Sequence, residues 1–186
     1  MQWRLSILGL CVCLAAAPCL AAEPEKQENP LKNAKVGDWA SYKMTNEAGG
    51  KTIDMKVKMT VTAKDDKEAK LQSAVTLGDK EFPGQETKID LTKPYDPAST
   101  ANIPKEADAK VKMLDEGKET ITVGKTKYEC KWVTMKVTAK VQNTDFESEV
   151  KVWMSKDAPL TGMVKMEMKS SVTNVTMMLD ESGKSK

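Results

Sequence analysis

Residue types that usually carry enzymatic chemistry are scarce in this sequence. Histidine is absent, which removes the commonest general base of hydrolases and the commonest metal ligand. Paired carboxylates occur at Asp65 and Asp66, but they stand in a charged turn and follow no calcium-loop spacing. The sequence therefore predicts no catalytic residue, no cofactor site and no metal site, and a protein that is not an enzyme.

Methionine is the one chemically distinctive residue type, with 12 in the chain. Five of them gather near the C-terminus, at Met163, Met166, Met168, Met177 and Met178. Thioethers bind cuprous copper, which raises the hypothesis of a copper carrier. A strand core explains the spacing better, because Met166 and Met168 would share a face with Val164 while Met163 would point to the other side. Flexible methionines also line adaptable apolar binding sites.

The first 22 residues have the pattern of an export signal. Arg4 precedes an apolar stretch over residues 5–20, and the small residues Ala21 and Ala22 follow it. The stretch is short for a membrane span and is interrupted by Pro18. We expect cleavage after Ala21 or Ala22 and a mature chain without a transmembrane segment, located in the periplasm or outside the cell.

Three of the four cysteines lie in this signal, at Cys11, Cys13 and Cys19. None of them is preceded by the small residues that favour lipidation. Only Cys130 remains in the mature chain, so no intramolecular disulfide can form. Its strand-like surroundings over residues 128–134 predict a buried thiol rather than a reactive one.

The charge composition argues against nucleic acid as a partner. The chain has 29 basic and 27 acidic residues, and the single arginine, Arg4, lies in the signal. Planar recognition of phosphates and bases favours arginine over lysine. Lysines on the outward faces of strands serve instead to keep a sheet soluble and to discourage edge-to-edge aggregation.

A two-residue alternation of apolar and polar side chains dominates the mature chain, most clearly over residues 51–64. This period is typical of strands with one apolar face. Strands are predicted over residues 39–44, 51–64, 69–77, 81–91, 119–123, 127–141, 147–155, 161–169 and 172–179. The predicted fold is all-β with minor α content, an antiparallel up-and-down meander of about nine strands that forms a half-barrel, a barrel or a sandwich.

Four segments break the alternation. Residues 23–35 predict a flexible leader, and the single β-domain follows over residues 36–180. Residues 92–117 predict an irregular insert, with a short helix over 105–114, that serves as a lid or binding loop. The apolar phase slips inside the strand over residues 127–141, which predicts a bulge near Trp132. Residues 181–186 predict a disordered tail.

Two stretches resemble a group of small exported bacterial β-rich proteins of unknown function. These stretches are residues 36–42, with the sequence VGDWASY, and residues 152–165, which contain VWMS and GMVK. More loosely, a signal followed by a long meander and an irregular insert is similar in architecture to the half-barrels of periplasmic lipoprotein-localisation factors. That resemblance implies a curved sheet that shields acyl chains. The chain departs from those carriers in having few aromatic residues and no arginine after the signal.

Two functional hypotheses follow. The first is an exported non-catalytic binding protein for an apolar or lipid-like ligand, with the inner face of the sheet as the site and residues 92–117 as the gate. The second is an envelope or cell-surface interaction module that has a packed core, binds an envelope protein through its lysine-rich outside and holds no small molecule. An apolar cavity of several hundred cubic ångströms on the inner face would favour the first.

Overall fold

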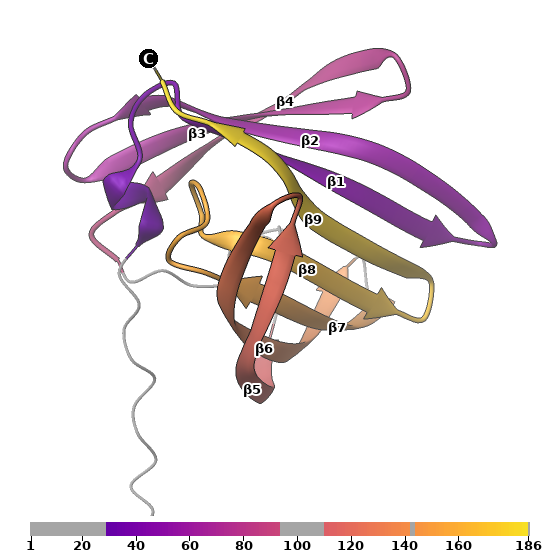
Figure 1. Cartoon of the computed structure of the whole chain (residues 1–186). Coiled ribbons are helices and arrows are strands. Elements are labelled where there is room, and N and C mark those ends of the chain that lie inside the picture. The colour runs from indigo at the N-terminus through magenta and orange to yellow at the C-terminus, as the bar shows by residue number, and fades with distance from the viewer. Residues whose placement is uncertain (1–28, 94–109, 142–143, 186) are drawn as a thin grey trace, which may run out of the picture.

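The computed structural model describes residues 29–93, 110–141 and 144–185 (Figure 1). Its elements in chain order are the 3-10 helix η1 (Pro30–Asn33) and the strands β1 (Trp39–Ala48), β2 (Lys51–Lys64), β3 (Glu68–Leu77), β4 (Lys80–Asp90), β5 (Lys110–Val123), β6 (Thr126–Val141), β7 (Thr144–Met154), β8 (Met163–Ser170) and β9 (Thr173–Gly183). The predicted fold class is confirmed.

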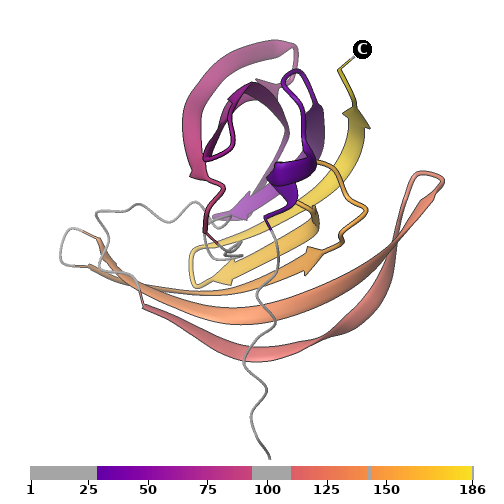
Figure 2. The same ribbon diagram turned by 90° about the vertical axis from the view of Figure 1, so that its left-hand side faces the viewer.

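The strands form one antiparallel sheet in the order β4-β3-β2-β1-β9-β8-β7-β6-β5. Apart from β4 and β5, strands that are neighbours in sequence pair with each other, and the pairing of β1 with β9 joins the two halves at the centre of the sheet. Two glycines with positive φ, Gly49 and Gly50, form the β1–β2 turn, as a tight hairpin requires. Within the described residues, β4 and β5 are the edge strands and do not pair with each other, so the sheet is not closed, and its curvature gives it the form of a half-barrel (Figure 2).

The half-barrel has two ends that differ in how they are covered. We call the end with η1, the β2–β3 and β5–β6 turns and the β7–β8 connection the closed end. The opposite end, with the β1–β2, β3–β4 and β8–β9 turns, is the open end. Figure 2 shows β5 and β6 bent into a broad arc below the more tightly rolled β1–β4, with η1 close to the rolled part.

The predicted irregular insert is partly wrong. Residues 110–117 belong to β5, which pairs with β6 along its whole length. The charged side chains of this segment masked its strand character, since β5 is an edge strand with most of its residues exposed. The predicted helix over 105–114 is therefore wrong for residues 110–114. The rest of that helix, and residues 94–109 of the predicted lid, lie outside the described residues.

The predicted bulge near Trp132 is also wrong. The register shift lies in β5, where Leu114 is the extra residue, and β6 pairs with β7 without any shift. The apolar phase changes along β6 because the strand buries one face near its start and the other face further along. The buried residues are Tyr128, Cys130 and Thr134 on the first face and Met135, Val137 and Ala139 on the second.

Both predicted flexible ends are held in place where they are described. Leu31 of η1 is fully buried, and its backbone N–H donates to Oδ1 of Asn29 at 3.1 Å. At the other end, β9 continues to Gly183, and the backbone N–H of Ser185 donates to Oδ1 of Asp38 at 2.8 Å. Residues 29–35 and 181–185 are therefore ordered parts of the domain. The predicted signal, 1–22, lies outside the described residues.

Candidate functional site

The concave face of the sheet carries rows of apolar side chains that run across the strands. Residues directly opposite each other on neighbouring antiparallel strands point to the same face. One row consists of Met55, Met44, Met177, Met166, Val152 and Val133, and the next of Ile53, Asn46, Val175, Met168, Val150 and Met135. Methionine and valine therefore make up most of this surface.

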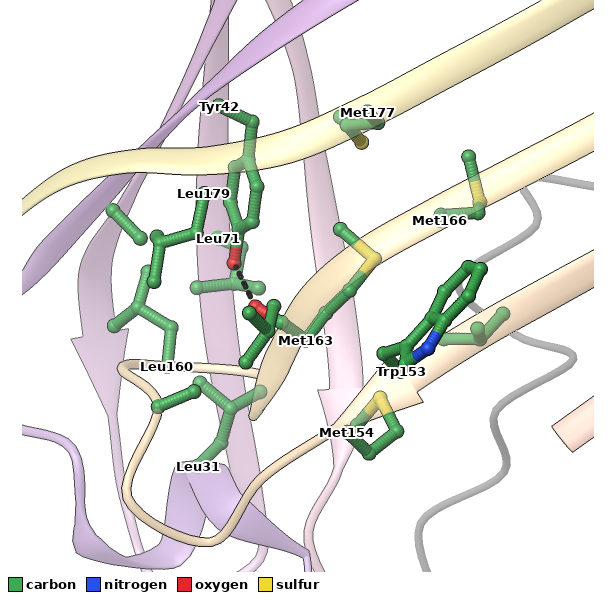
Figure 3. Close-up of a cluster of buried hydrophobic side chains, with 14 of the residues drawn as sticks. Leu31, Tyr42, Leu71, Trp153, Met154, Leu160, Met163, Met166, Met177 and Leu179 are labelled. Carbon is green, nitrogen blue, oxygen red and sulfur yellow. Dashed lines mark hydrogen bonds between the residues drawn. The ribbon is translucent and has the colours of Figure 1, made fainter. Parts of the chain in front are cut away.

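The closed end of the concave face is sealed by a buried cluster. This cluster includes Leu31 from η1, Leu160 from the β7–β8 connection and Leu179 from β9 (Figure 3). Leu160 is held at a φ of 50°, an unfavourable conformation for a leucine that burial of its side chain offsets. The connection and η1 thus act together as a plug.

Tyr42 on β1 is a buried polar residue beside this plug. Its side chain is fully buried, and its hydroxyl donates to the backbone carbonyl of Met163 at 3.3 Å (Figure 3). Burial raises the pKa of Tyr42 to about 12, because the charged phenolate is poorly solvated there. The hydrogen bond ties β1 to the start of β8 and satisfies a carbonyl that is otherwise remote from water.

The open end of the same face exposes large apolar side chains. Their exposed fractions are 43% for Ile53, 45% for Leu77, 49% for Phe82, 42% for Val111 and 54% for Met113. They come from β2, β3, β4 and β5, and Val172 in the β8–β9 turn lies at the same end. They extend from one edge strand of the sheet, β4, to the other, β5, and exposed apolar surface at one end of a face is a candidate interaction or ligand site.

A pocket of about 710 Å³ lies at the closed end, away from the methionine rows. It is bordered by η1, the β7–β8 connection and the ends of β1, β6 and β9, and among its lining residues are Asn29, Trp39, Tyr128, Ser155 and Lys184. Its volume is in the range of small-molecule sites. Its lining is mixed polar and apolar, so it is a different kind of surface from the concave face.

The convex face carries lysines stacked on tryptophans. The ammonium of Lys151 lies 3.8 Å from the ring centroid of Trp132 and 4.7 Å from that of Trp153, and Lys165 lies 4.7 Å from Trp153. Trp153 also donates its indole N–H to Glu119 at 2.8 Å. Such contacts stabilise each cation only modestly at a surface. They order these lysines over the aromatic rings.

A second group of convex-face lysines pairs with Asp180. Lys43 and Lys56 lie 2.8 and 3.2 Å from its carboxylate oxygens. The hydrogen bond from Lys43 is the largest of the effects that lower the pKa of Asp180, and Asp180 in turn raises the pKa of Lys56. These ion pairs connect β1, β2 and β9 on the convex face, and we interpret them as structural contacts.

Cys130 is buried, as the sequence predicts. It is 3% exposed, and its thiol donates to the backbone carbonyl of Tyr128 at 3.5 Å. Burial raises the pKa of the Cys130 thiol. Because the thiolate is the reactive form, this residue has the properties of a structural cysteine.

The predicted carboxylate pair separates into a turn former and an exposed neighbour. Asp65 accepts the backbone N–H groups of Lys67 and Glu68, both at 2.7 Å, and these bonds lower the pKa of Asp65. Its side chain therefore shapes the β2–β3 turn. Asp66 is exposed in the same turn.

Within the described residues, no cluster of three or more histidine, cysteine or carboxylate side chains is arranged to hold a metal ion. No helix in the described part of the chain has the length and apolar character that a membrane span requires.

Sequence reasoning missed the part of the site on β5. Val111 and Met113 alternate with Lys110 and Lys112, which is the strand pattern, but the surrounding prolines and charges led to the prediction of an irregular insert. Pairing with Val137 and Met135 on β6 places both side chains on the concave face. The local alternation was the signal that could have located them.

The comparison with known proteins identifies the fold of this chain. No protein-family model and no curated protein matches the sequence. A candidate exported protein from Bacteroides fragilis NCTC 9343 with a YmcC-like fold has a TM-score of 0.54 at 12% identity, over 81% of this chain and 97% of that chain. A candidate lipoprotein from Parabacteroides distasonis ATCC 8503 has a TM-score of 0.49 at 13% identity, over 84% of this chain and 99% of that chain.

The first of these likenesses confirms, at the level of fold, the resemblance to exported β-rich proteins. The chain has a YmcC-like fold. A fold by itself does not determine what the protein binds. The similarity to lipoprotein-localisation factors stays a prediction.

Proposed function

We propose that this protein is an exported, non-catalytic binding protein that holds an apolar, lipid-like ligand on the concave face of its half-barrel. The ligand enters at the open end and lies along the rows of methionine and valine. Export is supported by the N-terminal sequence pattern, and the candidate exported protein with the same fold agrees with it. The rows on the concave face offer an apolar surface to such a ligand.

The observation that carries the proposal is the exposure of large apolar side chains at one end of one face. Each exposed square ångström of apolar surface forgoes roughly 25 cal/mol that burial would supply. Phe82 and Met113 are about half exposed, although neighbouring concave-face positions such as Val150 and Met135 are only 1% exposed. An apolar ligand that covers the open end would recover this free energy.

The composition of the face fits a ligand of variable shape. Methionine side chains have three rotatable bonds and polarizable sulfur, so they adapt to differently shaped apolar partners. Met44, Met55, Met59 and Met168 are partly exposed around the buried core. These side chains can rearrange over a bound chain without disturbing the buried cluster at the closed end.

The test compares the same substitution at the two ends of the molecule. Val111 at the open end and Val36 at the closed end are 42% and 52% exposed, so both accept aspartate at little cost in stability. We expect Val111→Asp to weaken binding of the fluorescent fatty acid cis-parinaric acid by about tenfold or more, equivalent to about 1.4 kcal/mol. Val36→Asp serves as the matched control and should bind like the unsubstituted protein.

Native mass spectrometry of the exported protein provides the second readout, because a co-purified apolar molecule would appear as a stoichiometric adduct. Absence of both an adduct and probe binding would contradict the proposal. It would favour the alternative function, an envelope interaction module with a packed core. Equal loss of binding in both variants would contradict the assignment of the site to the open end.

A further inference from the structure

Four methionines from four different strands stand in one cross-strand row. Met55 on β2 is opposite Met44 on β1, Met44 is opposite Met177 on β9, and Met177 is opposite Met166 on β8. We call these four residues the methionine ladder. Figure 3 shows Met177 and Met166 side by side on their neighbouring strands. Of these four residues, only Met166 and Met177 belong to the group of five methionines near the C-terminus that the sequence shows.

The spacing of a sheet allows neighbouring ladder side chains to converge. Directly opposed residues have Cβ atoms about 4.5–5.5 Å apart, and each methionine reaches further through three flexible bonds. The sulfur atoms of Met44 and Met177 can therefore approach a common point together with that of Met55 or Met166. Met168 is the diagonal neighbour of Met177, since it follows Met166 by two residues on β8.

The donor set of the ladder is uniform and soft. Every side chain in the row from β2 to β8 is a thioether, and the adjoining row of Ile53, Asn46, Val175 and Met168 contributes no charged group. Thioether sulfur selects soft cations such as Cu(I), whereas Mg²⁺, Ca²⁺ and Mn²⁺ prefer oxygen ligands. Zn²⁺ sites use thiolate, imidazole and carboxylate, which these rows lack.

We infer that the methionine ladder is a binding site for a soft monovalent cation of the Cu(I) or Ag(I) type. The site is graded in accessibility: Met44 and Met55 are partly exposed, whereas Met177 and Met166 are 7% and 9% exposed. A cation thus meets the outer pair first and is then held among buried thioethers. Neutral thioether ligands release no proton on binding, in contrast to thiolate sites.

The inference is independent of the proposed apolar ligand. Leucine is nearly isosteric with methionine and equally apolar, so replacing ladder residues by leucine removes the sulfur donors while keeping a surface that binds lipid. Loss of cation binding with retained binding of cis-parinaric acid therefore separates the two functions. If the protein binds no apolar ligand, the sulfur donors of the methionine ladder are still present, and the cation site does not depend on that ligand.

The test is titration of the mature protein with silver nitrate in a chloride-free buffer. The methyl groups of isotope-labelled methionines provide the readout by NMR. We expect one silver ion per chain, with shifts concentrated in Met44, Met55, Met166 and Met177. The double variant Met44→Leu/Met177→Leu should bind silver at least about tenfold more weakly, a loss of about 1.4 kcal/mol.

The matched control is Met178→Leu, because Met178 neighbours Met177 in sequence but points to the opposite face. It should bind silver like the unsubstituted protein, and urea unfolding of all three proteins verifies that each is folded. A parallel titration with Cu(I) in the presence of a chromophoric chelator decides which of the two cations is held more tightly. Silver binding that is absent, or equal in the double variant and the unsubstituted protein, would overturn the inference.

Discussion

The two ends of the half-barrel are built from the same alternating strands and yet bury their apolar residues to very different extents. At the closed end, η1 and the β7–β8 connection cover the concave face, and Leu31, Tyr42 and Leu160 are at most 6% exposed. At the open end, short turns join β1 to β2, β3 to β4 and β8 to β9, and Leu77, Phe82 and Met113 are about half exposed. Two features produce the difference: the connections that cover the closed end, and the edge position of β4 and β5, whose residues are mostly exposed.

This contrast assigns different roles to the two ends. Buried apolar area and a satisfied Tyr42 hydroxyl make the closed end a source of stability. Exposed apolar area at the open end contributes little to folding and remains available to a ligand. Substitutions at the two ends should therefore separate stability from binding.

The largest expected effect comes from truncating the plug. Leu31→Ala removes a fully buried side chain and should lower the free energy of unfolding by about 2–5 kcal/mol. Leu77→Ala makes the same chemical change at a residue that is 45% exposed and should cost less than about 1 kcal/mol. Urea unfolding of both variants measures the difference, and equal losses would break the comparison between the ends.

The next effect depends on the buried Tyr42 hydroxyl at high pH. The pKa of Tyr42 is raised to about 12 in the folded protein and is about 10 in an unfolded chain. The unfolded state therefore loses this proton first, so stability is fully present below pH 10 and falls as the pH rises towards 12. A shift of that size corresponds to a loss of roughly 2–3 kcal/mol.

The control for this effect is Tyr42→Phe, which has no proton to lose. It should cost about 1 kcal/mol at pH 7 through the missing hydrogen bond, but its stability should fall less steeply above pH 10. Lysine side chains also titrate in this range and are common to both proteins, so the difference between them isolates Tyr42. Parallel decline of the two unfolding curves would show that the Tyr42 hydroxyl is solvated in the folded state.

The strands of both ends were predictable, because alternation is a local property that β2 displays over its whole length. The connections that distinguish the ends were less so. Residues 110–113 of β5 do alternate, but the prolines before them and the charges after them hid the strand, which pairing with β6 reveals. The order of η1 depends on burial of Leu31 against distant strands. The order of η1 is therefore set by a tertiary contact, which a local pattern does not encode.

The methionine ladder was likewise beyond reach from sequence. The positions of Met44 and Met55 follow from one hairpin, but the link between Met44 and Met177 depends on the register of β1 against β9. These strands lie at opposite ends of the described chain, and their register includes a shift between Ser41 and Tyr42. Local alternation predicts which face each methionine occupies, and only the assembled sheet determines which methionines are neighbours.

The smallest expected effect concerns how the closed end holds the chain after β9. Asp38 accepts the backbone N–H groups of Lys35 at 2.9 Å and Ser185 at 2.8 Å, and these two bonds lower the pKa of Asp38. A lowered carboxyl pKa contributes stability above the ordinary carboxyl range, and this contribution is lost as the pH falls through the folded pKa. Solvent screening keeps the effect small, because Asp38 is partly exposed.

Asp38→Asn should therefore destabilise the protein slightly at pH 7 and make its stability less dependent on pH in the acid range. Asp79 in the β3–β4 turn at the open end is exposed, and Asp79→Asn is the matched control, with little expected change. Hydrogen exchange at the Ser185 amide measures the contact directly, since its protection should fall in Asp38→Asn and persist in Asp79→Asn. Unchanged protection in both variants would mean that β-pairing of β9 with β1 alone holds this end of the chain, and that the closed end is sealed by apolar packing without help from Asp38.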